Sequence, residues 1–290
     1  MSVFKRSWRL SIEVNNQKKV FQEIENSDIS LKIDFQADTK GRNCVFAEGS
    51  VTIYGLNSDD MLFLASSATI NSSKNGLMKR NALQLEVGYN GNLANILAGN
   101  IIQVDCDLAN ADRRITLKVQ SAVGNNLSNK NIAISMQGDV DFQKICETAA
   151  EENGLRAKID KKITPIIQKG YSFVGTPFQM LDDLRKSFKD LCFRVLPDGK
   201  TLEIAPLESP TAADKTKLSE KTGLVGVPVP IQTGLQITSL LNTNFKAGGV
   251  ITLDSKVASQ FNGEWIITDL THRGGNQSSQ WLSIMKCRKL

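Results

Sequence analysis

The C-terminal third of the chain begins with Thr222-Gly-Leu-Val-Gly-Val-Pro-Val-Pro230 and continues with Gly234-Leu-Gln-Ile-Thr-Ser-Leu-Leu-Asn242. Short runs of alternating apolar residues are separated here by glycines and prolines, which is typical of antiparallel strands joined by tight turns. The expected strands lie near Leu224–Val229, Leu235–Leu240, Val250–Leu253, Trp265–Leu270 and Trp281–Met285. The unit is short for an independent barrel, so we expect it to borrow strands from its neighbours.

The N-terminal part of the chain has the same two-residue rhythm. Trp8, Leu10, Ile12 and Val14 alternate with polar residues, as in a strand with one buried face. The alternation recurs at Ile29–Phe35, Val51–Tyr54, Leu83–Val87, Ile101–Cys106 and Ile115–Val119. Asn90-Gly91 separates two such segments and predicts a hairpin turn. This part is therefore expected to be antiparallel β.

One short helix is expected to interrupt these strands, at Ser58–Ala68. Ser58 can cap it, and Asp59 and Asp60 lie at the positive end of the helix dipole. Its apolar residues, Met61, Leu62, Leu64 and Ala65, would plug one end of a rolled sheet.

The spacing of apolar residues becomes helical from Gly138. A helix is expected to begin at Asp139 and to end at Asn153-Gly154. A second helix is expected to begin at Thr176-Pro177, because a capping threonine precedes a proline at the first helical position. A hairpin closed around Asp198-Gly199 follows.

These patterns predict three domains. Residues 1–125 form an N-terminal β-barrel-like domain, 126–206 an α+β insert domain, and 207–290 a C-terminal β domain that completes a second barrel. The polar stretch Glu208–Lys217 is a linker or a crossing loop. The expected fold class is mainly β with an α+β insert, in which two β-barrel-like domains flank a small α+β domain.

The cysteines do not form a pattern for metal or redox chemistry. The five are widely scattered in the chain: Cys44, Cys106, Cys146, Cys192 and Cys287. They never fall in the close pairs that build zinc or redox sites, so reduced and mostly buried thiols are expected. We expect no metal and no cofactor.

The net charge of +5 and the pI near 8.9 are mildly basic. The lysines and arginines are dispersed, which favours a solvated face over a phosphate track, and no aromatic residues are interleaved with them for stacking on nucleic acid. No apolar run approaches the roughly 20 residues that span a bilayer, and the N-terminus lacks a secretory signal. We therefore expect synthesis and retention in a cytoplasm until assembly.

The search for catalytic residues gives none. His272 is the single histidine, which excludes two-histidine zinc sites, and we interpret it as a strand-end residue with a local hydrogen bond. The acidic pairs are adjacent residues on expected helices, where they point in different directions: Asp59-Asp60, Glu151-Glu152 and Asp182-Asp183. Gly170–Gly175 and Gly223–Gly226 lack the lysine and spacing of a phosphate-binding loop and are interpreted as turns.

Two groups of residues carry a resemblance to a known family. The insert contains Gly170-Tyr-Ser-Phe-Val-Gly-Thr-Pro-Phe-Gln-Met-Leu-Asp-Asp-Leu184, followed by the expected hairpin. The C-terminal unit contains, in order, Thr222–Gly226, Leu240–Asn242, Leu253–Ser255, Asn262-Gly263, and His272 with Trp281. Together they resemble the baseplate hub proteins of contractile-tailed, Mu-like bacteriophages, a tail hub family shared with type VI secretion spike heads. Gly49–Asn57 matches more loosely.

This resemblance implies a structural protein without catalysis, located in the tail baseplate of the virion and assembled in the host cytoplasm. It implies a homotrimer whose barrel-like domains form a pseudo-sixfold ring between the hexameric tail tube and the trimeric central spike. The implied partners are the tube protein, the spike protein and other baseplate proteins. DNA would pass only in transit, during genome ejection, and no stable membrane insertion is implied.

Two other function classes remain open from the sequence. A carbohydrate-binding or adsorption module of a tail would need aromatic platforms on exposed loops, whereas Trp8, Trp265 and Trp281 lie in strand patterns. A tail-associated peptidoglycan hydrolase would need a glutamate of raised pKa, for which Glu151 and Glu208 are the candidates.

Overall fold

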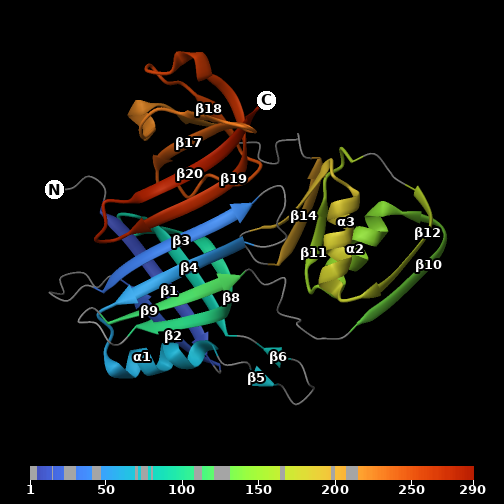
Figure 1. The fold of residues 1–290 in the computed structure, drawn as a ribbon, viewed down its shortest axis with the longest axis horizontal. Coiled ribbons are helices and arrows are strands. Elements are labelled where there is room, and N and C mark those ends of the chain that lie inside the picture. The colour runs from blue at the N-terminus through green and yellow to red at the C-terminus, as the bar shows by residue number, and fades with distance from the viewer. Residues whose placement is uncertain are drawn as a thin grey trace.

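A computed structural model describes residues 5–14, 16–22, 31–40, 47–68, 71–72, 78–79, 81–107, 113–120, 131–163, 167–196, 200–206 and 215–290. The chain is mainly β, and an insert with two helices lies beside a body built around one large sheet (Figure 1). The expected fold class, mainly β with an α+β insert, is confirmed. Across these ranges no helix is long and apolar enough to cross a membrane.

The large sheet has 13 strands and runs through both β units. Its strands are β1 (Arg6–Val14), β2 (Gln17–Gln22), β3 (Lys32–Lys40), β4 (Ala47–Tyr54), β7 (Ala82–Tyr89), β8 (Asn92–Asp107), β9 (Arg114–Gln120), β15 (Lys215–Leu218), β16 (Val229–Ile231), β17 (Gly234–Leu240), β18 (Val250–Leu253), β19 (Gly263–Gly275) and β20 (Trp281–Lys289). The order is β16-β17-β20-β19-β3-β4-β9-β8-β7-β1-β2, and β18 branches from β19 to carry β15. A short ribbon, β5 (Asn71–Ser72) with β6 (Met78–Lys79), stands apart.

The alternation expected in the N-terminal part is confirmed. Trp8, Leu10, Ile12 and Val14 of β1 are all buried in the first core, because every second side chain of a strand points to the same face. Asn90 and Gly91 join β7 to β8 with φ of 51° and 80°, the two positive values that a type I′ hairpin turn requires.

The expected short helix is present as α1 (Ser58–Ala65), followed by a 3-10 turn at Ser66–Ala68. Its cap is Asn57 and not Ser58, since the Asn57 side chain accepts a hydrogen bond from the Asp60 backbone N–H. Met61 and Leu64 are buried, as expected of a plug, but Leu62 is 73% exposed and Ala65 is exposed as well. The prediction was wrong for Leu62 and Ala65 because they lie on the outer side of the helix.

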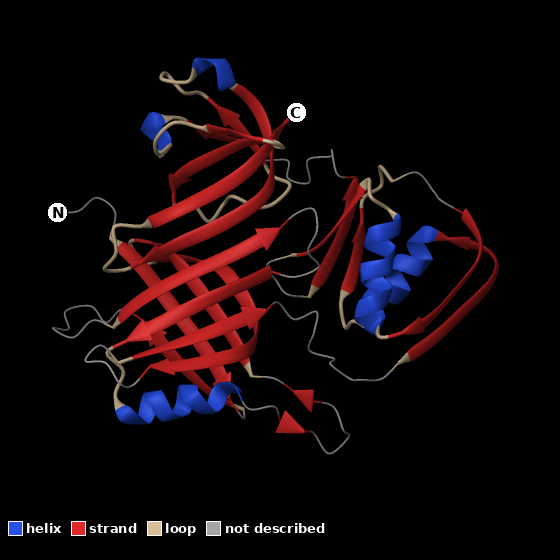
Figure 2. Cartoon of the chain, in the orientation of Figure 1, coloured by secondary structure: helices blue, strands red, loops and turns tan. Residues whose placement is uncertain are grey.

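The insert consists of β10 (Ile132–Asp141), α2 (Phe142–Glu152), β11 (Arg156–Ile159), β12 (Ile167–Gly175), α3 (Pro177–Ser187), β13 (Leu191–Val195) and β14 (Thr201–Pro206). The two helices lie between the β10–β12 ribbon and the β11-β14-β13 sheet (Figure 2). Both helices contribute apolar side chains to a separate core.

Several expected boundaries in the insert and the C-terminal unit were wrong. The helix expected from Asp139 begins at Phe142 and is capped by Asp141, because the preceding residues pair as β10. Gly170–Gly175 belongs to strand β12 and is not a turn. The strand expected at Leu224–Val229 is reduced to an isolated bridge at Leu224 and to β16. The expected hairpin strands pair as β13 and β14, whereas Asp198-Gly199 lies outside the described residues.

Helix α3 begins where the sequence predicts, with Thr176 as cap and Pro177 in the first turn. Gln179 completes a capping box, because its side chain accepts from the Thr176 N–H while the Thr176 hydroxyl accepts from the Gln179 N–H. Thr176→Ala should lower the free energy of unfolding by about 1 kcal/mol in chemical denaturation. Thr148→Ala, at a half-buried position inside α2, is the matched control and should be neutral or slightly stabilising. Equal losses for the two variants would contradict the role of the cap.

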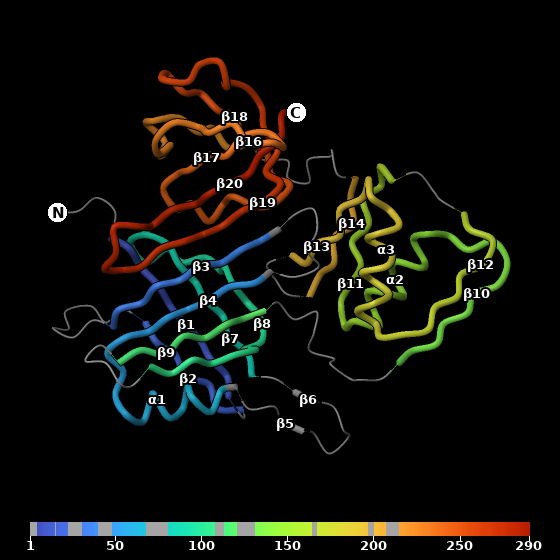
Figure 3. Tube along the Cα trace, viewed as in Figure 1, coloured from blue at the N-terminus to red at the C-terminus, as the bar shows by residue number. Residues whose placement is uncertain are grey.

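The two β units share their sheet at the β3–β19 junction, which Figure 3 traces across the middle of the body. Asp269–Gly275 of β19 pairs with Asp34–Lys40 of β3. At its end Gly275 lies so close to β3 that an added Cβ would stand 2.8 Å from the backbone oxygen of Ile33, which cannot move aside as a side chain can, so glycine is required there. The expected sharing of strands therefore takes the form of one uninterrupted sheet.

Candidate functional site: the cleft between the three units

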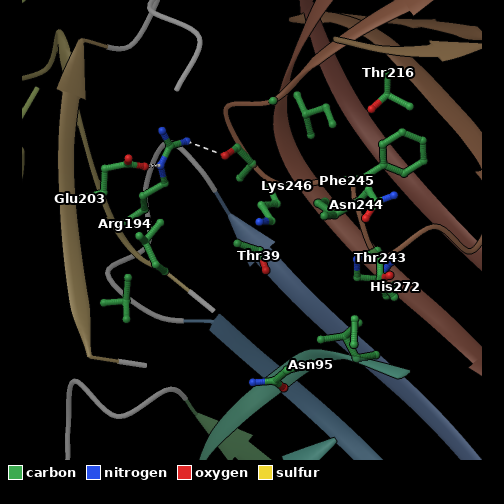
Figure 4. Close-up of a pocket in the computed structure, with 18 of the residues that line it drawn as sticks. Thr39, Asn95, Arg194, Glu203, Thr216, Thr243, Asn244, Phe245, Lys246 and His272 are labelled. Carbon is green, nitrogen blue, oxygen red and sulfur yellow. Dashed lines mark hydrogen bonds and ion pairs between the residues drawn. The ribbon is translucent and has the colours of Figure 1, made fainter. Parts of the chain in front are cut away.

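A cleft of about 880 Å³ opens where the N-terminal unit, the insert and the C-terminal unit meet (Figure 4). Thr39 and Asn95 line it from the N-terminal unit, Arg194 and Glu203 from the insert, and the loop around Lys246 from the C-terminal unit. Its lining mixes apolar side chains, such as Phe245 and Leu270, with charged, hydroxyl and amide groups. We take it as the candidate site because it is where all three units converge.

Arg194 and Glu203 form a buried ion pair on the wall contributed by the insert. Arg194 Nε donates to Glu203 Oε2 at 2.8 Å, and both side chains are 7% exposed. On the surface side of the pair, Lys158 Nζ donates to Glu203 Oε1 at a distance of 2.9 Å. Arg194 Nη1 donates to the carbonyl oxygen of Ala247 at 2.7 Å, so the pair connects the insert to the C-terminal unit (Figure 4).

The sequence reasoning missed this pair, although a signal was present. The hairpin predicted from Asp198-Gly199 would place residue 194 opposite residue 203, and Arg194 and Glu203 are paired in the structure. Opposite charges at paired positions of otherwise apolar strands indicate a buried ion pair.

His272 is buried in β19 and lines the cleft. Its Nδ1 lies 2.9 Å from Ser283 Oγ, and that hydroxyl accepts from the Asn242 N–H at 3.0 Å. The Ser283 hydroxyl, which can both donate and accept, therefore links the imidazole to the backbone of Asn242. The expected local hydrogen bond is confirmed, but His272 lies inside a strand and not at its end.

Burial lowers the pKa of His272 from 6.5 to about 4. Between about pH 6.5 and pH 4 the unfolded chain therefore binds a proton that the folded chain does not bind. The contribution to stability is complete above pH 6.5 and is lost as the pH falls towards 4, by about 3 kcal/mol in total. Urea unfolding at pH 7 and pH 4.5 measures this loss.

His272→Gln is the comparison for that measurement, since it removes the titrating group while an amide can still bond Ser283. The variant should lose less stability than the natural chain over the same pH interval. An identical pH dependence in the two proteins would show that burial of His272 is not the cause.

The acidic pairs serve helices and do not converge on the cleft. Asp60 forms an ion pair with Lys19, and Asp59 is exposed in the first turn of α1. Asp182 is bound by Lys186 and Arg185, whose hydrogen bonds lower the pKa of its carboxyl. Glu151 and Glu152 are exposed at the end of α2, and Glu208 lies outside the described residues.

The expectation of mostly buried thiols agrees with three of the four described cysteines. Cys146, Cys192 and Cys287 are buried, Cys106 is exposed, none of the four is in a disulfide, and Cys44 lies outside the described residues. Burial raises the pKa of Cys287 to about 12, which makes it a poor nucleophile. In the described ranges no three histidine, cysteine or acidic side chains gather as they would around a metal ion.

The three tryptophans are buried, at 2% exposed for Trp8 and Trp281 and 7% for Trp265. Their rings fill the cores and offer no exposed platform on which a sugar could stack. Gly223 and Gly226 have φ of 107° and 69°, in agreement with their interpretation as turns.

Comparisons with known proteins give one family. A family model described as baseplate hub gp41 matches residues 9–287. No curated protein matches the chain in sequence. Among solved structures the chain is similar to the 43 kDa tail protein of prophage MuSo2 from Shewanella oneidensis, with a TM-score of 0.59, 9% identity and 98% of each chain covered.

Two further solved structures have the same fold. The tail protein from Neisseria meningitidis MC58 has a TM-score of 0.61 and 11% identity, with 97% of this chain and 96% of that chain covered. The E. coli c3393 protein, described as a type VI secretion component with structural similarity to the T4 tail proteins gp27 and gp5, has a TM-score of 0.61 and 12% identity. The match covers 92% of this chain and 76% of the E. coli chain. At such identities the likeness shows the fold.

Proposed function

Since the chain belongs to the baseplate hub gp41 family, a family of structural proteins of bacteriophage tails, we propose a trimer. In this trimer the three copies form a pseudo-sixfold ring. The ring joins the hexameric tail tube to the trimeric central spike and surrounds the channel for DNA. The observation that carries the proposal is the family match over all three units, together with the single sheet that holds two β units side by side in each chain. Three such chains present six β units.

The outer face of the shared sheet supports the proposed channel. Pairing across β19, β3 and β4 aligns Arg273 with Gln36 and Ser50, and Thr271 with Asp38 and Glu48. Hydroxyl and amide groups with charges of both signs are thus interleaved on this face. Such a surface neither attracts a phosphate backbone strongly nor offers bases a stacking partner, so DNA could pass without being held.

The proposal includes the partners and the location that the family resemblance implies. The ring contacts the tube protein on one side, the spike on the other and further baseplate proteins around it, and it assembles in the host cytoplasm without catalytic activity. Residues 1–125, 126–206 and 207–290 are its proposed domains, of which the two β domains form the ring.

Electron microscopy of the purified protein, alone and mixed with its tail tube and spike proteins, tests the ring. Threefold class averages with an open centre, and a ring seated between tube and spike in the mixture, are the expected result. Monomeric particles that neither close into rings nor join the tube and spike would contradict it. A cell-wall zymogram should show no band, and lysis that disappears in Glu151→Gln would instead favour the hydrolase.

A further inference from the structure

An apolar patch lies at the free end of the large sheet, on the C-terminal unit. It consists of Val225, Val227, Val229 and Leu240, which are 37%, 52%, 52% and 45% exposed. Backbone hydrogen bonds hold the patch together, since the Val225 N–H donates to the Thr238 carbonyl and the Leu240 N–H donates to the Gly223 carbonyl, each at 2.8 Å. We call these four residues the tip patch.

The tip patch is built for side-chain packing and not for the addition of another strand. Pro230 has no N–H, so the hydrogen-bonded pairs of β16 with β17 must be made by its neighbours Val229 and Ile231. The backbone of Pro230 then faces outward, where an added strand would need a donor. A folded surface can cover the patch, whereas an extended peptide would find an interrupted edge.

The opposite end of the body carries a small surface of complementary chemistry. Asp59 and Leu62 are three residues apart on α1, so they lie on the same side of the helix. Leu62 is 73% exposed, and Asp59 is exposed as well. On the other end, the exposed Lys221 lies two residues before Gly223, whose carbonyl accepts from the Leu240 N–H. The tip patch thus has a positive charge near it in the chain, and the exposed Leu62 has a negative charge beside it.

We propose that the tip patch of one chain packs on the α1 surface of a second copy, with Lys221 facing Asp59. The two surfaces lie at opposite ends of the body, as α1 and β16 show in Figure 3. A contact between different surfaces at opposite ends generates a ring when the rotation closes. The inference rests on the proposed ring and names the surfaces through which its copies meet.

Sedimentation velocity of the full chain over a range of concentrations tests the contact. Val227→Asp and Leu62→Asp each place a charge in one surface and should weaken self-association at least about tenfold. Val174→Asp is the matched control, because Val174 is 77% exposed on β12 in the insert and belongs to neither surface. Melting temperatures within a few degrees of the natural chain show that the variants are folded.

A mixture of Val227→Asp and Leu62→Asp distinguishes this contact from others. Each variant keeps one intact surface, so the mixture should form dimers and nothing larger. Lys221→Asp and Asp59→Lys should each weaken the trimer, and the double variant should recover it. Mixtures that contain no dimer, or a double variant no stronger than the single ones, would overturn the proposed pairing.

Different results would overturn the proposed contact and the proposed ring. Trimers that persist in Val227→Asp and Leu62→Asp would overturn the contact and leave the ring intact. If Val227→Asp kept the trimer but lost binding to the spike, the tip patch would be a spike surface. A natural chain that stays monomeric at every concentration, and forms no ring with its tube and spike, would overturn both.

Discussion

Trp281→Ala should lower the free energy of unfolding by about 3–5 kcal/mol, because it removes a large buried ring and leaves a cavity. Trp281 is on β20, in the C-terminal unit, yet its side chain belongs to the core of the N-terminal unit. It packs edge-on against Phe35, with ring centroids 5.2 Å apart, and against Tyr89 at 6.4 Å. Arg6 lies over the ring, 5.5 Å from its centroid. Chemical denaturation measures the loss.

Hydrogen exchange shows where the loss occurs. Amide protection in Trp281→Ala should fall first in β1, β3 and β7, whose side chains form the first core with Trp281, and less in β17 and β18. Lys286→Ala, at an exposed position on the same strand, should change stability by no more than about 0.5 kcal/mol. Protection lost mainly in β17 and β18 would show that Trp281 supports the C-terminal core instead.

Arg194→Met should cost about 3–5 kcal/mol, since it leaves the buried carboxylate of Glu203 without its buried partner. Glu203 retains Lys158, but that side chain is 61% exposed and its contribution is weakened by water. The substitution also removes the donor to the Ala247 carbonyl, so exchange in the loop around Lys246 should increase. Urea unfolding and hydrogen exchange measure the two effects.

A double variant separates the buried charge from simple loss of packing. Arg194→Met with Glu203→Leu removes both charges and should recover most of the stability that Arg194→Met loses. Lys186→Met is the surface comparison, because the Lys186–Asp182 pair has a lysine 64% exposed and should contribute less than about 1 kcal/mol. A loss no larger in Arg194→Met than in Lys186→Met would contradict the structural role of the buried pair.

Local signals predicted local structure well. Thr176-Pro177 and Asn90-Gly91 were both placed correctly, since a helix cap and a hairpin turn are decided by residues a few positions apart. The ribbon of β10 and β12 was missed. A period-two signal was present, because Ile132, Ile134 and Met136 of β10 alternate with Ala133, Ser135 and Gln137. The sequence does not show that these side chains are partly buried against the core of the insert.

The candidate site could be predicted only in part. The sequence identified His272 as a residue with a local hydrogen bond, but its partner Ser283 and the neighbouring Asn242 are fixed by strand pairing. Arg194 and Ala247 come from different units and meet only when the insert lies against the C-terminal unit. The pattern of apolar residues around Arg194 and around Ala247 does not predict that contact.

The sequence by itself determined most of the period-two strands, the cap of α3, the order of the three units and, through its motifs, the family. These are properties of neighbouring residues and persist in any tertiary context that buries one face. Tertiary structure alone decided that Asp34–Lys40 pairs with Asp269–Gly275, and that Trp281 fills a core built mostly by the first third of the chain. The reason is physical: contacts between segments more than 200 residues apart are selected by shape, by the register of hydrogen bonds and by the burial of whole faces. None of these is encoded within a local window.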